Sequence, residues 1–119
     1  MAQNPDVQRK AQEEIDAVVG PEQLPTLSGR GRLPYVEAVI KEVLRWRPAV
    51  PLGIPRRVGS DDMYEGYRIP SDSIIISNVW AISRDVNPKY PASEFIPERF
   101  LDENPLVDPA SYVFGFGRR

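Results

Sequence analysis

The stretch Lys41-Glu42-Val43-Leu44-Arg45-Trp46-Arg47-Pro48 gives the strongest indication of the fold. It ends an apolar periodicity that begins near Pro34, and Pro48 stops the helix which that periodicity predicts. The expected buried face of this helix consists of apolar residues at helical spacing: Val36, Val39, Ile40, Val43 and Leu44. Glu42 and Arg45 are expected on the opposite side, as neighbours three residues apart.

Two interpretations of Glu42 and Arg45 are open. An exposed pair at this spacing is common and contributes only a few tenths of a kcal/mol. Downstream, however, Pro97-Glu98-Arg99-Phe100 supplies a second cluster of arginine and carboxylate, preceded by Phe95. If Arg99 reaches the pair, the three side chains form a buried network, which is worthwhile only where it fixes a geometry.

Upstream, a first helix is predicted from Asn4 to about Val19. Asn4 can cap it, Pro5 suits its first position, and Gly20-Pro21 stops it. Its apolar stripe comprises Val7, Ala11, Ile15 and Val18. A polar connector then leads to the second helix.

After Arg47 the pattern changes to short strands, since nine of the 13 prolines fall from Pro48 onward. Three strands are predicted, at 54–58, 64–69 and 73–79, and the last two are expected to form a hairpin around Pro70-Ser71-Asp72. A helical turn is expected at 80–85, followed by a proline-rich irregular path to Phe100. The fold class is therefore mainly α with a small β-sheet.

Composition removes several classes of function. The 119 residues contain no cysteine and no histidine, which excludes disulfides, ordinary zinc sites, thiol nucleophiles and imidazole bases within this sequence. A formal net charge of −2 gives no field that favours nucleic acid. Arginine makes up 12 of the 15 basic residues, which indicates either buried or ligand-facing charge or simple compositional drift. No apolar run is long enough to span a bilayer.

Two further arginine clusters are candidate binding sites. Pro55-Arg56-Arg57 follows the apolar turn 50–54, and it is either a charged sheet edge or a pocket wall with an anion anchor. Phe114-Gly115-Phe116-Gly117-Arg118-Arg119 lets the backbone approach a flat partner beside two cations. It lacks the Gly-Lys-Ser/Thr ending of a phosphate loop and the third glycine of a dinucleotide site.

In this order, these pieces resemble the C-terminal part of a cytochrome P450, the haem-thiolate monooxygenase family, of fungal or other eukaryotic type. Glu42-Val43-Leu44-Arg45 resembles the Glu-x-x-Arg motif of the family's K helix, and residues 4–20 resemble its J helix. Phe95-Ile96-Pro97-Glu98-Arg99-Phe100 resembles the Phe-x-Pro-Glu-Arg-Phe segment of the meander. Residues 114–119 resemble the opening of the haem-binding signature, Phe-x-x-Gly-x-Arg-x-Cys-x-Gly. The resemblance covers 1–119 as one partial domain.

The resemblance implies roles for individual residues. Glu42, Arg45 and Arg99 would form a structural ion-pair network. Haem-binding residues would be Arg57, Phe114, Gly117 and Arg119, with the two arginines on the propionates. Substrate contacts would be Val50, Leu52, Gly53 and Ile54. These 119 residues would contain no catalytic or metal-ligating residue, because the axial cysteine is expected two positions beyond Arg119.

The expected parent protein oxidises an apolar organic molecule with dioxygen and electrons from a reductase. This chain by itself is expected to be inactive and to hold haem poorly. Eukaryotic members are usually anchored in the endoplasmic-reticulum membrane, and this chain contains no such anchor segment. The alternative is a small proline-rich protein-binding module without haem. A third, weaker candidate is an anion or nucleotide site at Arg118 and Arg119.

Overall fold

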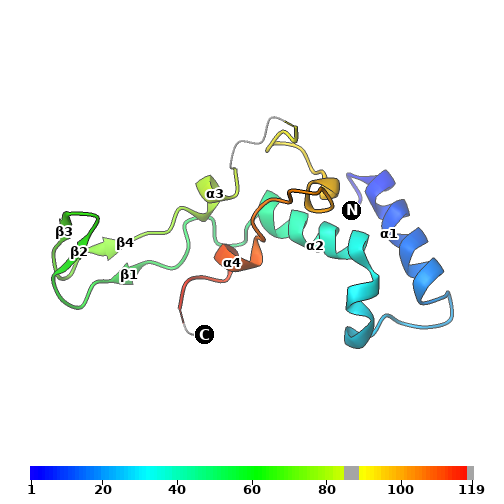
Figure 1. Ribbon diagram of the computed structural model, residues 1–119, viewed down its shortest axis with the longest axis horizontal. Coiled ribbons are helices and arrows are strands. Elements are labelled where there is room, and N and C mark those ends of the chain that lie inside the picture. Colours follow the sequence, from blue (N-terminus) through cyan, green and yellow to red (C-terminus); the bar gives the residue numbers. More distant parts are fainter. Residues whose placement is uncertain (85–88, 118–119) are drawn as a thin grey trace.

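The computed structural model describes residues 1–84 and 89–117 (Figure 1). The molecule is elongated, with extents of 57 × 33 × 27 Å and a radius of gyration of 18.3 Å. A compact domain of this length would have a radius of about 13.5 Å. Helix α2 lies in the middle, α1 lies beside it at one end, and the strands extend to the other end (Figure 1).

Helix α1 spans Pro5–Val18, which confirms the first predicted helix. Asn4 occupies the N-cap position, although its side chain forms no capping hydrogen bond, and Pro5 is the first helical residue. The predicted apolar stripe is buried or half-buried along its length. The connector, predicted only as polar, contains a 3₁₀ helix, η1, at Leu27–Arg32.

Helix α2 spans Pro34–Trp46, as predicted, but its expected buried face is only partly correct: Val39 is buried and Val36 and Leu44 are half-buried. Glu42 is 0% exposed and Arg45 is 1% exposed, whereas Ile40 and Val43 are 45% and 50% exposed. The physical reason is long-range: the 3₁₀ helix η2 (Pro97–Phe100) and the irregular segment before it cover the charged side of α2. A helical pattern places charge toward solvent unless such a partner is known.

The predicted hairpin between 64–69 and 73–79 is also wrong. The strands are β1 (Arg56–Arg57), β2 (Asp62–Tyr64), β3 (Tyr67–Ile69) and β4 (Ile74–Ile75). Antiparallel pairing joins β2 to β3, with Tyr64 opposite Tyr67, and β1 to β4, with Arg57 opposite Ile74. Glu65 and Gly66 both have positive φ, 48° and 84°, so these two residues make the tight turn. The turn at Pro70 still forms, but it returns the chain to β1.

The remaining elements are short. Helix α3 spans Val79–Ile82, where the Asn78 side chain accepts a hydrogen bond from the Ala81 amide at 3.0 Å, and α4 spans Ala110–Val113. A helical turn was predicted at 80–85, but residue 85 and Pro88 lie outside the described residues, as do Arg118 and Arg119. No helix within the described parts is long and apolar enough to cross a membrane.

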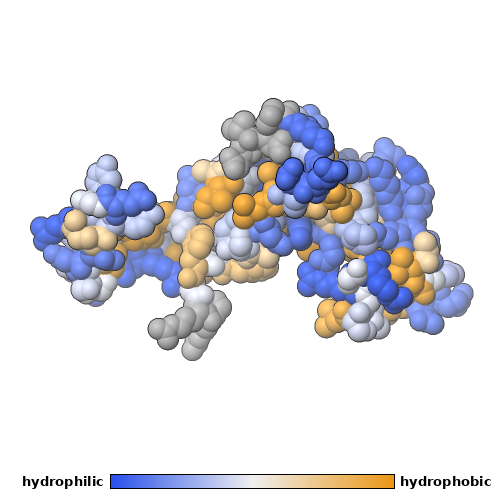
Figure 2. All heavy atoms as spheres, in the orientation of Figure 1, coloured by the Kyte–Doolittle hydropathy of each residue, from blue (hydrophilic) through white to orange (hydrophobic). Residues whose placement is uncertain are grey.

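The apolar core is small. Its buried members among the described residues are Ala11, Leu33, Ala38, Val39, Val79 and Tyr112. Figure 2 shows hydrophobic residues at the surface over the middle of the molecule, between the strands and α1. The largest fully buried side chains are instead charged: Arg45, Arg99 and Glu42. Buried charge therefore organises the centre of this chain.

Candidate functional site

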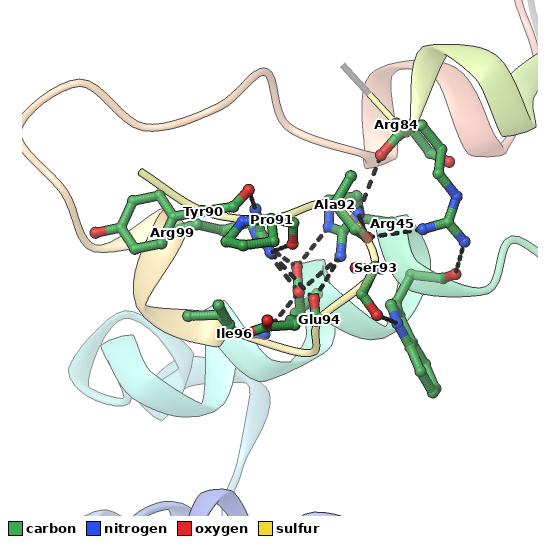
Figure 3. A network of polar contacts seen from close by, with 12 residues as sticks. Arg45, Arg84, Tyr90, Pro91, Ala92, Ser93, Glu94, Ile96 and Arg99 are labelled. Atoms are coloured by element: carbon green, nitrogen blue, oxygen red, sulfur yellow. Dashed lines mark hydrogen bonds and ion pairs between the residues drawn. The ribbon is translucent and has the colours of Figure 1, made fainter. Parts of the chain in front are cut away.

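Glu42, Arg45 and Arg99 form a buried cluster, here called the ion-pair hub (Figure 3). Arg45 donates two hydrogen bonds to the Glu42 carboxylate, from Nε at 2.7 Å and from Nη2 at 2.9 Å. Arg99 Nε donates to Glu42 Oε1 at 3.1 Å across 57 residues of sequence. The structure thus brings together the three residues that the sequence grouped.

Arg45 uses every donor it has. Besides its two bonds to Glu42, its Nη1 donates to the carbonyls of Ser83 and Ala92 at 3.1 and 3.0 Å, and its Nη2 donates to the carbonyl of Glu94 at 3.1 Å. A guanidinium has five N–H groups in a fixed plane, and all five are satisfied here. Lysine could not reproduce this arrangement, because its ammonium is a single point with three donors.

Arg99 binds the same irregular segment from the other side. Its Nη1 donates to the carbonyl of Tyr90 at 3.0 Å, and its Nη2 donates to the carbonyls of Pro91 and Glu94 at 3.0 and 3.1 Å. Burial lowers the pKa of Arg99 from its ordinary value, and Glu42 opposes that shift. The cluster holds two cations and one anion, so the backbone carbonyls supply the rest of the negative potential.

The segment 90–96 is therefore shaped by side chains, since it has no regular backbone ladder of its own. The Ile96 amide donates to Glu42 Oε1 at 2.8 Å, and Trp46 Nε1 donates to the Ser93 carbonyl at 3.1 Å. Trp46 also meets Phe95 edge to face, with ring centroids 5.6 Å apart. Glu42 is fully enclosed, and its oxygens accept hydrogen bonds from Arg45, Arg99 and the Ile96 amide.

A hollow of about 80 Å³ lies between the turn before β1, the residues before α3, and the chain after α4. Its walls are mostly apolar and include Val50, Ile54, Val79, Tyr112, Phe114 and Phe116. Burial raises the pKa of the Tyr112 phenol. Enclosed ligand sites usually measure about 300–1,000 Å³, so this hollow is smaller than such a site.

The predicted binding residues separate into two groups. Val50, Gly53, Ile54 and Phe114 line the hollow, whereas Leu52 is exposed and outside it. Arg57 also lies outside, on an exposed strand, where its Nε is 3.3 Å from a carboxylate oxygen of Asp72. Arg119 falls outside the described residues.

Arg56, the neighbour of Arg57, lines the hollow. Gly117 packs against it so closely that a Cβ added at Gly117 would lie 3.0 Å from Arg56 Nη2. The Arg56 guanidinium forms no ion pair or hydrogen bond with any residue in 1–84 or 89–117. Strand periodicity could have identified it, because residues two apart share a face and Ile54 already lines the hollow. Sequence reasoning also missed Ser77, Val79, Tyr112 and Val113.

This wall fits a flat apolar group that carries an anionic substituent. Two exposed phenylalanines give this wall aromatic, apolar surface, and two glycines leave the backbone beside them open to close approach. Arg56 adds a cation that has no carboxylate partner among the described residues. Haem, with its apolar ring and two propionates, has this chemistry. No group of histidine, cysteine, aspartate or glutamate in the described residues is placed to hold a metal ion.

Comparison with known proteins agrees with these features. The family model for cytochrome P450 matches residues 1–119. The cytochrome P450 monooxygenase claR of Ampulloclitocybe clavipes is 53% identical over 118 residues, which are 97% of this chain and 22% of that protein. The cytochrome P450 monooxygenase ppsD of Aspergillus oryzae is 48% identical over 124 residues, covering all of this chain and 24% of that protein.

A further relative is the O-methylsterigmatocystin oxidoreductase of Aspergillus flavus, 46% identical over 122 residues, covering all of this chain and 23% of that protein. The chain thus spans about a quarter of the length of the curated relatives it matches. The match to the family model extends over every residue of the buried hub and of the hollow's wall. The chain belongs to the cytochrome P450 family.

Proposed function

We propose that this chain forms part of the haem-binding core of a cytochrome P450 monooxygenase. When bound, the haem supplies the iron at which dioxygen is activated and one oxygen atom is inserted into an apolar organic molecule, with electrons from a reductase. The observation that carries the proposal is an apolar, glycine-lined wall with a cation, Arg56, whose side chain has no partner among the described residues, in the same chain as the buried ion-pair hub.

The hub's part in this function is to hold the irregular segment 90–96 in one shape. Arg45 and Arg99 bind five carbonyl groups there and at Ser83, and Glu42 holds both arginines. A segment without a backbone ladder keeps one conformation only if side chains fix it. In the family this corresponds to the K helix and the meander, and the proposed role of the three residues is structural.

Arg56 is the proposed propionate anchor among the described residues, in place of Arg57. Its guanidinium borders the hollow and has no competing carboxylate in 1–84 or 89–117, whereas Arg57 faces Asp72. A guanidinium pairs bidentately with a carboxylate, which suits a propionate at the edge of an apolar ring. Gly117, which packs on Arg56, keeps room for this side chain, and Arg119 remains the second proposed anchor.

Val50, Gly53 and Ile54 are the proposed substrate-contacting residues. They lie on the apolar side of the hollow, and they contribute no charge to it. Transfer of an apolar organic substrate from water to such a surface is favourable in free energy. Leu52 is proposed as a contact only where a substrate extends beyond the hollow.

The 119 residues contain no cysteine, so they do not contain the thiolate ligand that the family uses on iron. We therefore propose that this chain by itself does not catalyse oxidation, and that its function requires further sequence of the family. The elongated shape and the exposed apolar residues support this requirement, since they leave helix faces for other parts of a larger core.

A chimera tests the proposal. The corresponding quarter of the Ampulloclitocybe clavipes relative, which is 53% identical, is replaced with this chain. We expect the purified chimera to contain haem and to show the thiolate-type Soret band after reduction under carbon monoxide. A folded chimera without haem would contradict the proposal.

The anchor is tested with two neighbouring variants of the same chimera. Reconstitution with haem is compared with reconstitution with haem dimethyl ester, which has the ring but no propionate charge. Arg56→Gln should reduce the preference for the free acid about threefold to tenfold, because a charge-assisted contact is lost. Arg57→Gln is the matched control and should leave the preference unchanged. Equal effects of the two variants would assign the anchor to neither.

A further inference from the structure

A second polar cluster joins three elements outside the ion-pair hub. Glu14 of α1 accepts hydrogen bonds from the amides of Tyr35 and Val36, both at 2.9 Å, one to each carboxylate oxygen. These amides belong to the first turn of α2, where helix N–H groups have no partner within the helix. The residue at the N-cap position of α2, Leu33, offers no side-chain acceptor. Glu14 therefore caps α2 from another helix.

Lys10 extends the same cluster to η2. It lies four residues before Glu14 and so shares its face of α1. Lys10 Nζ is 2.6 Å from Glu98 Oε1, and the Tyr35 hydroxyl donates to the same oxygen at 3.3 Å. Burial alone would raise the pKa of Glu98, but the bond from Lys10 brings it below its ordinary value. Here the clasp denotes Lys10, Glu14, Tyr35, Val36 and Glu98.

Two elements, α2 and η2, each contribute residues to both the clasp and the hub. Glu98 and Arg99 are consecutive in η2, so one residue of that turn enters the clasp and the next enters the hub. On α2, Val36 and Glu42 are six residues apart, roughly 9 Å along the helix axis. A shift of α1 would therefore move both elements whose side chains meet at Glu42.

We propose that Glu14 and Lys10 make α1 a positioning element for the hub, by holding the first turn of α2 and the turn η2 at the spacing at which Arg99 reaches Glu42. This positioning requires no haem. A displacement of α1 would change the contact between Arg99 and Glu42, to which α1 contributes no atom.

Amide hydrogen exchange in the intact chain tests this inference. Tyr35 and Val36 report the clasp directly, and Ile96 reports the hub, because its amide donates to Glu42 at 2.8 Å. Glu14→Ala should accelerate exchange about tenfold at Tyr35 and Val36, as expected for a lost helix cap. It should also accelerate exchange at least threefold at Ile96.

Glu13→Ala is the matched control, because Glu13 has the same charge on the same helix but bonds only to the exposed Arg9. It should leave all three amides unchanged. Glu14→Gln keeps an amide oxygen that can accept one bond, so it should produce a smaller acceleration than alanine; it also serves if the alanine variant does not fold. Lys10→Met should accelerate Ile96 without removing the cap.

Three results would overturn the inference. If the Glu14→Ala variant exchanged faster at the Tyr35 and Val36 amides but not at the Ile96 amide, Glu14 would be only a local cap of α2. If Glu13→Ala accelerated exchange as much as Glu14→Ala, the cause would be the lost negative charge on α1 and not the lost contact with α2. Equal acceleration at Val58, whose amide bonds to the Ser73 carbonyl in the strand region, would indicate general destabilisation.

Discussion

The ion-pair hub and the strand arm, residues 56–76, distribute charge and apolar surface in opposite ways. In the hub, three charged side chains are among the most buried of the described residues. In the arm, Ile74, Ile75 and Met63 are exposed, and the ion pair of Arg57 and Asp72 lies at the surface. The segment 90–96, which the hub holds, and the arm both lack long regular structure. The difference is that the hub is closed by side-chain hydrogen bonds to backbone, whereas the arm depends on two short strand pairs.

This contrast indicates where stability resides. Buried ion pairs do not stabilise a fold merely by being charged, because desolvation offsets much of their attraction. Breaking such a pair nevertheless costs much folding free energy, because removal of one partner leaves the other charge buried and unpaired. Short two-stranded ribbons with exposed residues are marginal by themselves. Substitutions in the hub should therefore have large effects, and substitutions in the arm should have small ones.

The largest effect is expected from Glu42→Ala. It would leave Arg45 and Arg99 buried without an anion, at a cost of about 3–5 kcal/mol. In the chimera we expect loss of bound haem, measured by absorbance per protein. Glu37→Ala on the same helix is the control, because Glu37 pairs with Arg30 at the surface, and it should retain haem. Normal haem content in the Glu42 variant would contradict the structural role of the hub.

An intermediate effect is expected at high pH, through Tyr35 of the clasp. Burial, with the charge of Glu98, raises the pKa of Tyr35 from 10.0 to about 12. The folded chain thus holds this proton more tightly than the unfolded chain. The contribution of Tyr35 is complete below pH 10 and is lost as the pH rises toward 12. Two pKa units correspond to about 2.7 kcal/mol, and solvent screening of this half-buried side chain reduces the contribution below that value.

Phenolate absorbance measures this titration. The tyrosine titration of the folded chain should include a step near pH 12 that Tyr35→Phe removes. In urea, which unfolds the chain, the pKa of this step should return toward 10.0, the ordinary value of a tyrosine phenol. A titration that is unchanged by Tyr35→Phe above pH 11 would be evidence against burial of this hydroxyl in the clasp.

The sequence predicted some of this architecture well. Pro5 and Pro34 at helix starts and Gly20 and Pro48 at helix ends are local signals, and both long helices follow them. The hub's burial could not be predicted from the pattern of α2, because the covering segment is about 50 residues away in sequence. The same limit applies to the exposed apolar residues Ile40 and Val43, whose periodicity alone predicts a buried face.

Two errors have local causes. The hairpin was misassigned because Glu65 lacks the usual turn chemistry, although Gly66 supplies it, while Pro70 gave a stronger turn signal. The family resemblance indicates Arg57, whereas the two-residue period of a strand, counted from Ile54, indicates Arg56.

A smaller effect is expected from Gly53→Ala, at the border between the hub region and the arm. Gly53 has φ of +61°, and a Cβ there would lie 3.2 Å from the Cβ and carbonyl oxygen of Ser77. The strain should cost about 1–2 kcal/mol. Gly66→Ala has similar φ but open space around it, so it separates backbone strain from the clash. If both variants lower the chimera's thermal midpoint equally, the close approach of Ser77 contributes nothing.

The smallest effect is expected from Arg57→Ala in the arm. Its ion pair with Asp72 is exposed, with both side chains 72% accessible, so the change should be below about 0.5 kcal/mol. The measurement is the opening free energy of the Val58 amide by hydrogen exchange in the chimera. A loss above 1 kcal/mol would show that the arm is held more firmly than its exposure indicates.

A pair of double-mutant cycles tests the central claim, that buried charge organises this chain. The first combines Glu42→Gln with Arg99→Met and is measured on the α2 amides of the chimera by native-state hydrogen exchange. The second combines Arg57→Ala with Asp72→Asn, chosen because asparagine tolerates the positive φ of residue 72, and is measured on Val58. The predicted coupling is about 2 kcal/mol or more in the hub and below about 0.5 kcal/mol in the arm. Coupling in the hub no larger than that in the arm would contradict the claim.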